Sequence, residues 1–238
     1  MSKTTLLFRD DPYARAAEAT VIGLAENGGI ILDRTIFYAQ GGGQPGDVGW
    51  MTLRGGEEIA IANAVYGPDR ATIAHVPAAA GPSPAVGDRV NLRLDWDVRH
   101  ARMRVHTALH LLSVALPFPV TGGAIGDGEG RLDFDIPDAG LDKDEIGVKL
   151  NEMIAKDAPV RERWITDEEL LANPGLVKTM SVKPPMGSGT VRLVEIEGLD
   201  LQPCGGTHVK STGEIGAVAI TAIEKKGRQN RRVRIALA

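Results

Sequence analysis

One stretch decides the fold: Arg89-Val-Asn-Leu-Arg-Leu94 and, directly after it, Asp95-Trp-Asp-Val-Arg-His-Ala-Arg-Met-Arg-Val-His106-Thr-Ala-Leu-His110. Up to Leu94, apolar and polar residues alternate, which is the period of a strand with one buried face. From Asp95 to Pro117, apolar residues recur at helical spacing, and Asp95 or Asp97 can cap the helix. The change of period predicts two domains, residues 1–95 and residues 96–238.

Short strand-like runs precede this change, separated by turn-forming residues, at 19–22, 29–33, 59–61, 71–75 and 89–94. Many short strands at near-regular spacing predict a small β-barrel. After the first helix, the pattern predicts a turn at Gly122-Gly123, a second helix over 142–156, and strands at 131–136, 191–196, 217–223 and 233–237. We therefore expect an α+β protein: a small N-terminal β-barrel, then a two-layer domain of helices on a mostly antiparallel sheet.

Composition sets the outer bounds on function. The chain has 238 residues, of which 43% are apolar and 24% charged, with a net charge of −4. Its one cysteine cannot form an internal disulfide, and the apolar run near the start is too short for a signal peptide. These features predict a cytoplasmic protein with no membrane segment. The net negative charge argues against indiscriminate attraction to polyanions.

Two short signatures can supply one metal site. His106 and His110 lie four residues apart on the predicted helix, so both imidazoles project from one face. Cys204 and His208 add a thiolate and a third imidazole, with a glycine pair between them that permits a tight turn. This donor set predicts one Zn²⁺ per chain, the alternative being polar residues scattered through the core. His75 and His100 fall outside the pattern.

The glycine run Gly41-Gly-Gly-Gln-Pro-Gly46 is not a phosphate-binding loop, because it lacks the Lys and Ser or Thr that would meet phosphate and magnesium. A tight barrel turn is the simpler interpretation. With no ATP-binding motif in the sequence, we expect no ATP and no synthetase activity.

Basic residues cluster near the end of the chain, where Lys225, Lys226, Arg228, Arg231, Arg232 and Arg234 stand against Glu224. A second group, Arg99, Arg102 and Arg104, precedes the histidines. Such runs are equally typical of a solvated surface, so alone they do not establish binding to nucleic acid. Large aromatic residues are scarce, and we expect base readout to contribute little.

The chain resembles the AlaX family of freestanding alanyl-tRNA editing proteins, which are similar to the editing domain of alanyl-tRNA synthetase. Five ordered segments carry the resemblance: Phe37-Tyr-Ala-Gln-Gly-Gly-Gly-Gln-Pro-Gly-Asp47, Val86-Gly-Asp-Arg-Val-Asn-Leu-Arg-Leu-Asp95, His106-Thr-Ala-Leu-His-Leu-Leu112, Gln202-Pro-Cys-Gly-Gly-Thr-His208 and Arg231-Arg-Val-Arg-Ile235. The resemblance implies a barrel followed by the two-layer domain shared with threonyl-tRNA synthetase. It also implies hydrolysis of the ester of mischarged alanine tRNA, carrying serine or glycine, in a zinc-containing cleft.

The same resemblance suggests roles for individual residues. The zinc ligands of the family correspond to His106, His110, Cys204 and His208. A loop formed by Gln40, Gly41, Gly42, Gly43 and Gln44 would border the substrate. Gly122 stands where the synthetase editing domain carries a glutamine, so Thr121 is the candidate to bind a serine hydroxyl. Lys225, Lys226, Arg228, Arg231 and Arg232 would contact the acceptor end of the tRNA.

The mechanism is left open by the sequence. Four protein ligands are typical of a structural zinc site, so Thr107 or Thr121 is a candidate to position the attacking water. Two alternative functions remain: a tRNA-binding module whose zinc is purely structural, and a metallohydrolase of small esters. The sequence does not indicate the oligomeric state.

Overall fold

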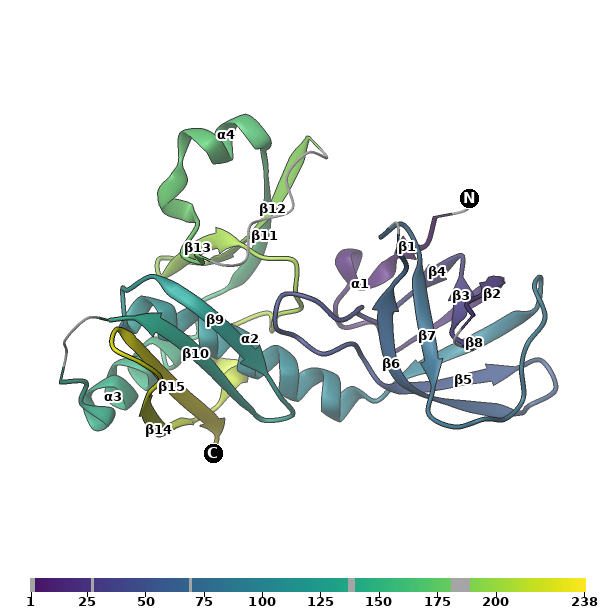
Figure 1. The fold of residues 1–238 in the computed structure, drawn as a ribbon, viewed down its shortest axis with the longest axis horizontal. Coiled ribbons are helices and arrows are strands. Elements are labelled where there is room, and N and C mark those ends of the chain that lie inside the picture. The colour runs from purple at the N-terminus through teal and green to yellow at the C-terminus, as the bar shows by residue number, and fades with distance from the viewer. Residues whose placement is uncertain (1–2, 27, 69, 137–139, 181–188) are drawn as a thin grey trace. The chain divides into compact units, whose positions relative to one another are not determined.

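The structure is a computed structural model that describes residues 3–26, 28–68, 70–136, 140–180 and 189–238 (Figure 1). The chain divides into two compact units, Met1–His100 and Ala101–Ala238. The division falls within helix α2 (Trp96–Ala115), whereas the sequence placed it between residues 95 and 96. The predicted α+β fold is confirmed, with mostly antiparallel sheets and a closed barrel.

The first unit is the barrel. Its described strands close in the order β2-β3-β7-β6-β5-β8, and neighbouring strands run antiparallel. Of these, β5 was missed by the sequence pattern. A short parallel pair and a single helical turn lie outside the barrel. The bounds are β1 (Thr5–Leu6), α1 (Leu7–Asp10), β2 (Ala16–Leu24), β3 (Ile30–Leu32), β4 (Arg34–Thr35), β5 (Gly49–Leu53), β6 (Glu58–Tyr66), β7 (Ile73–Pro77) and β8 (Arg89–Leu94).

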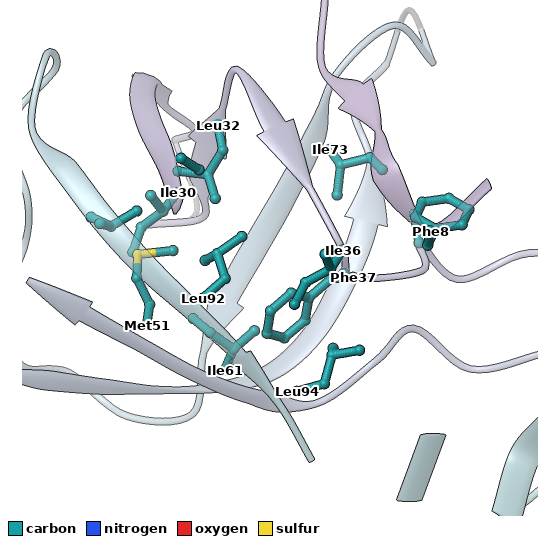
Figure 2. Close-up of a cluster of buried hydrophobic side chains, with 14 of the residues drawn as sticks. Phe8, Ile30, Leu32, Ile36, Phe37, Met51, Ile61, Ile73, Leu92 and Leu94 are labelled. Carbon is teal, nitrogen blue, oxygen red and sulfur yellow. The ribbon is translucent and has the colours of Figure 1, made fainter. Parts of the chain in front are cut away.

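Apolar side chains fill the barrel interior, as Figure 2 shows for Ile30, Leu32, Phe37 and Leu92. Along β8 burial alternates residue by residue, as the sequence pattern predicts for a strand with one buried face. Each fully buried side chain of this size contributes roughly 1.5–3 kcal/mol to folding. The barrel therefore has a hydrophobic core of its own.

The first unit also buries polar groups. His75 on β7 lies inside the barrel: its Nε2 is 2.7 Å from the hydroxyl of Thr35, and its Nδ1 is 2.9 Å from the carbonyl oxygen of Ile30. Arg99 is buried as well and forms an ion pair with the carboxylate of Asp47. A buried charge of this kind is tolerated because it is paired and hydrogen-bonded.

The second unit has two layers in its main part. An antiparallel sheet runs in the order β14-β15-β10-β9, and helices α2 and α3 cover one face of it (Figure 1). Gly130 permits the close approach of α2, because a Cβ atom there would lie 2.6 Å from Val105 and 3.2 Å from Leu109. The bounds are β9 (Val120–Ile125), β10 (Glu129–Asp135), α3 (Lys143–Ile154), β14 (Val218–Lys225) and β15 (Asn230–Leu237).

The predicted turn at Gly122-Gly123 is wrong, because both glycines lie within β9 and pair with β10. A Cβ atom on Gly123 would lie 3.0 Å from a methyl group of Leu132, so the absence of a side chain serves the tight approach of the two strands. The predicted helix over 142–156 is confirmed, with Asp142 as its N-cap.

A further sheet, β11-β12-β13, joins the second unit, and helix α4 lies beside it (Figure 1). Only β12 was predicted. Among the described residues, no helix is long and apolar enough to cross a membrane. The bounds are β11 (Val160–Thr166), α4 (Asp167–Ala172), η1 (Pro174–Leu176), β12 (Thr190–Ile196), β13 (Asp200–Pro203) and η2 (Thr212–Ile215).

Candidate metal centre

Helix α2 contributes two imidazoles from adjacent turns. The helix starts where Asp95 accepts a hydrogen bond from the backbone N–H of Val98, as predicted for a cap. Residues 105–113 of its later part are all buried, and His106 and His110 lie there with their ring centroids 5.3 Å apart. The spacing of four residues thus places both rings on one helix face.

The turn after β13 contributes the other two donors. Sγ of Cys204 lies 3.4 Å from Nε2 of His106 and 3.3 Å from Nε2 of His208. One candidate ligand atom from each of His106, His110, Cys204 and His208 lies within 4.8 Å of the others. Two segments almost a hundred residues apart in sequence therefore form one cluster that could hold a metal ion.

A carboxylate fixes the ring of His110 from behind. Nδ1 of His110 donates to Asp200, which is also contacted by Lys178 and by the side-chain amide of Gln202. Burial raises the pKa of Asp200, but the hydrogen bonds from His110 and Lys178 outweigh it and bring that pKa to about 2. Because Nδ1 is engaged by an ionised carboxylate, the lone pair on Nε2 is the one available to the cluster.

The hydroxyl of Thr107 orients the ring of His208, as Asp200 orients that of His110. The hydroxyl of Thr107 is buried and donates to the carbonyl oxygen of Met103, so Nδ1 of His208, 3.1 Å away, is the donor to Thr107. The backbone N–H of Val209 also donates to this hydroxyl. Nε2 of His208 is thereby left to face Cys204.

An arginine holds the turn that carries Cys204. Nη1 of Arg192 on β12 donates to the carbonyl oxygens of Cys204 and Gly206, and Nη2 donates to the carboxylate of Glu162. The backbone N–H of Gly206 lies 3.4 Å from Sγ of Cys204. Backbone N–H donors near a sulfur stabilise its negative charge.

The electrostatics favour a thiolate at Cys204. Burial raises the pKa of the thiol, but the imidazoles of His106 and His208 outweigh this and lower that pKa well below its usual value. For His208, burial and the nearby His106 lower the imidazole pKa to about 3. Burial lowers the pKa of His110, but Asp200 and Cys204 outweigh this and raise that pKa to about 9. A thiolate and neutral imidazoles are the forms that bind metals, so His110 must release a proton when an ion binds.

The remaining predicted residues lie elsewhere in the structure. Thr121 is half-buried on β9, where its hydroxyl donates to the carbonyl oxygen of Asp133 and accepts from the side chain of Asn230. Gly122 follows it in the same strand. The start of β9 is linked to the cluster indirectly, because Val120 donates to the backbone carbonyl of Lys178, whose side chain reaches Asp200.

The glycine-rich loop belongs to the first unit and forms a tight turn. Gly41 and Gln44 exchange backbone hydrogen bonds, and Gly42 and Gly43 between them both have positive φ angles, 59° and 83°. Two positive φ angles in a two-residue turn strongly favour glycine. Gln44 is buried, whereas Gln40 is exposed and its side-chain oxygen accepts from Asn63.

The predicted RNA-contacting residues lie on the β14–β15 hairpin. Lys226 pairs with Glu224, and Arg232 forms two hydrogen bonds with Asp133. Arg231 donates to the carbonyl oxygens of Gly227 and Asn230. Lys225 and Arg228 are exposed on the same hairpin.

The second basic group is not an exposed surface. Arg99 pairs with Asp47 inside the first unit, and Arg102 is buried against Asp127. Arg104 donates to the carbonyl oxygen of Ile215. These arginines are engaged in internal contacts, because their helix packs against the core on more than one side.

Sequence reasoning missed the residues that support the cluster. Asp200, Lys178 and Arg192 contact the ligands or their turn, yet they come from segments that share no local period with the histidines. The one available signal was Asp200 four residues before Cys204, the same spacing that led to His208.

Comparison with known proteins gives the family of the chain. Residues 8–98 match the family model "tRNA synthetases class II (A)", and residues 191–234 match "Threonyl and Alanyl tRNA synthetase second additional domain". The chain thus falls in the class of proteins related to class II tRNA synthetases.

Individual relatives identify the family within this class. The alanyl-tRNA editing protein AlaX-M of Methanosarcina mazei is 34% identical, with 98% of this chain and 96% of that relative aligned. AlaX-M of Saccharolobus solfataricus is 35% identical over 97% of both chains. The alanine–tRNA ligase of Korarchaeum cryptofilum is 38% identical over 93% of this chain and 25% of that enzyme. This chain belongs to the alanyl-tRNA editing protein family AlaX.

Proposed function

We propose that this protein is a trans-acting deacylase that hydrolyses the ester between a wrong amino acid and alanine tRNA. The observation that carries the proposal is the convergence of three imidazoles and one thiol from α2 and the turn after β13. Relatives that match nearly the whole chain bear the name alanyl-tRNA editing protein. Serine is the proposed amino acid, with glycine second.

The donor set fits zinc. Three imidazole nitrogens and one thiolate are typical of Zn²⁺ sites, and the engaged Nδ1 atoms of His110 and His208 leave Nε2 for the ion. The chemistry that zinc supplies when bound is polarisation of an ester carbonyl and acidification of water. His106, His110, Cys204 and His208 would hold the ion.

Thr107 and Thr121 have different surroundings, which support different roles. The Thr107 hydroxyl is buried and engaged by Met103 and His208, so we assign it to orienting His208. Thr121 lies next to Val120, which is joined to the cluster through Lys178 and Asp200. We therefore assign Thr121 and Gly122 to the amino-acid pocket, with the Thr121 hydroxyl as the group that pairs with a serine hydroxyl.

The acceptor end would meet basic and glycine-rich surfaces. Lys225, Arg228 and Arg231 are better placed for phosphate contact than Lys226 and Arg232, whose charges are paired with carboxylates. Gln40 and the backbone of Gly41, Gly42 and Gly43 would contact the substrate, while the buried Gln44 holds the turn. Glycine backbone without side chains permits such close approach.

The test measures the release of labelled serine from alanine tRNA that has been mischarged with serine. The same tRNA charged with glycine or with alanine serves for comparison. We expect rapid release of serine, slower release of glycine and retention of alanine. His110→Ala should abolish release, whereas His100→Ala, a histidine of the same helix that stacks on Trp96, should retain it. No release by the zinc-loaded protein would overturn the proposal.

Two further arms separate the alternatives. Binding of charged tRNA without hydrolysis would identify a binding module with a structural metal. Equal turnover of a serine alkyl ester that lacks RNA would identify a hydrolase of small esters. Both outcomes contradict the proposed function.

A further inference from the structure

An exposed tryptophan lies on the sheet that carries the cysteine turn. Trp164 on β11 is 53% exposed, although tryptophan is the largest apolar side chain and is mostly buried in folded proteins. In the strand order of the described residues, β11 is at the edge of the sheet β11-β12-β13. The ring is therefore accessible from outside the sheet.

The register places this ring in one row with the cysteine. Trp164 pairs directly with Arg192, and the backbone N–H of Cys204 donates to the carbonyl oxygen of Arg192 from the other side. Directly opposed residues of an antiparallel sheet point to the same face. Trp164, Arg192 and Cys204 thus form a row across the strands, and Trp164 is two strand spacings, about 10 Å, from the cysteine.

The face that carries this row is turned toward the metal centre. On the opposite face, Val191 and Leu193 pack with Leu170 of α4. On the face of the row, the Gln202 side chain contacts Asp200, the partner of His110. The exposed ring therefore lies on the side of the sheet that faces the cluster.

We propose that Trp164 is the stacking platform for the terminal base of the tRNA. The inference rests on the proposed function, which places the ester at the cluster, and it adds the group that binds the base. One ribose separates the ester from that base, so a flat apolar surface about two strand spacings from the cysteine is within reach. Stacking needs only the π-face of the base, which agrees with the scarcity of aromatics for sequence readout.

Arg192 and Glu162 complete the arrangement. Arg192 lies between Trp164 and Cys204 and is fixed by three hydrogen bonds, to Cys204, Gly206 and Glu162. Through Glu162, Arg192 thus ties the cysteine turn to strand β11, which carries Trp164. A base on the ring would be held at a fixed distance from the cluster.

The experiment measures binding of two hairpin RNAs to the zinc-loaded full chain. One hairpin ends in cytidine-cytidine-adenosine, and the other is identical except that its terminal nucleotide lacks a base. We expect the wild-type protein to bind the first about tenfold more tightly, and Trp164→Ala to bind both equally. Trp164→Phe should keep most of the preference, since a phenyl ring also stacks.

Leu171→Ala is the matched control, because Leu171 is an exposed apolar residue on α4 of the same subdomain. This variant should keep the full preference. With seryl-tRNA, Trp164→Ala should raise KM about tenfold and leave kcat within about twofold, as expected when binding is weakened equally in ground and transition states. A wild-type protein without the preference, or Trp164→Ala that keeps it, would overturn the inference. Failure to release serine would instead overturn the proposed function, because the binding measurement needs no hydrolysis.

Discussion

Both units of this protein bury histidines, and they use them in different ways. Inside the barrel, both ring nitrogens of His75 are satisfied by the protein, one by Thr35 and one by the Ile30 carbonyl. In the second unit, Nδ1 of His110 and of His208 is engaged, while Nε2 faces the cluster. Burial alone therefore does not identify a ligand. A ligand is identified instead by a ring nitrogen that faces the other donors of the cluster.

The largest expected effect tests the cluster itself. Cys204→Ala removes the thiolate, and a quarter of the ~10–16 kcal/mol typical of such sites corresponds to a roughly hundredfold to thousandfold weaker affinity for zinc. Zinc competition with a coloured chelator measures this, and serine release should fall with it. His75→Gln should leave zinc affinity unchanged. Retained metal in Cys204→Ala would place the ion elsewhere.

The next effect tests the barrel histidine. Burial lowers the pKa of His75 from 6.5 to about 4. Above pH 6.5 it is neutral in both the folded and unfolded states, and below this only the unfolded chain takes up the proton. Stability is thus lost as pH falls from 6.5 to 4, by up to about 3 kcal/mol from this residue. Urea unfolding across this range should show a shallower pH dependence for His75→Gln than for wild type, and equal slopes would contradict the assignment.

A smaller effect tests the support behind His110. Asp200→Asn keeps the shape but removes the charge that orients the ring, and loss of such a partner costs about 10–100-fold in metal affinity. Asp133→Asn is the control, because Asp133 is likewise an ion-paired carboxylate, held by Arg131 and Arg232, but it lies on β10 of the other sheet. Equal zinc affinities for the two variants would show that Asp200 does not act through His110.

The smallest effect tests the basic hairpin. The affinity for tRNA falls as salt rises, and replacing Lys225 and Arg228 with Ala should make this fall less steep. The magnitude of the slope of log affinity against log salt should decrease by roughly 0.7–0.9 for each phosphate that the variant no longer neutralises. Arg232→Ala should instead lower stability, because it leaves Asp133 without a bidentate partner. An unchanged slope in the double variant would mean that these residues do not touch phosphate.

Sequence succeeded where the signal was local. Residues four apart on a helix share a face, so His106 and His110 could be assigned to one site from their spacing alone. Alternation along residues 89–94 likewise predicted a barrel strand. Strand β11 was missed because, at an edge, Arg161, Glu162 and Arg163 are all exposed and leave no period of two.

The supporting contacts could not be predicted in the same way. Asp200 and Arg192 act on the ligands through pairings between strands and helices, and no local spacing encodes such pairings. Gly122 and Gly123 misled for a related reason. In a sequence, a glycine pair is typical of a turn. In the structure, the missing side chain of Gly123 instead allows β10 to pack closely against β9.

The two halves of the cluster are made at different times. His106 and His110 leave the ribosome long before Cys204, so a nascent chain carries half a site through most of its synthesis. A product cut short before residue 204 has two imidazoles and no thiolate, and such a pair binds zinc only weakly. Binding of an ion would also close a loop of nearly a hundred residues, which stabilises only a chain that extends as far as His208.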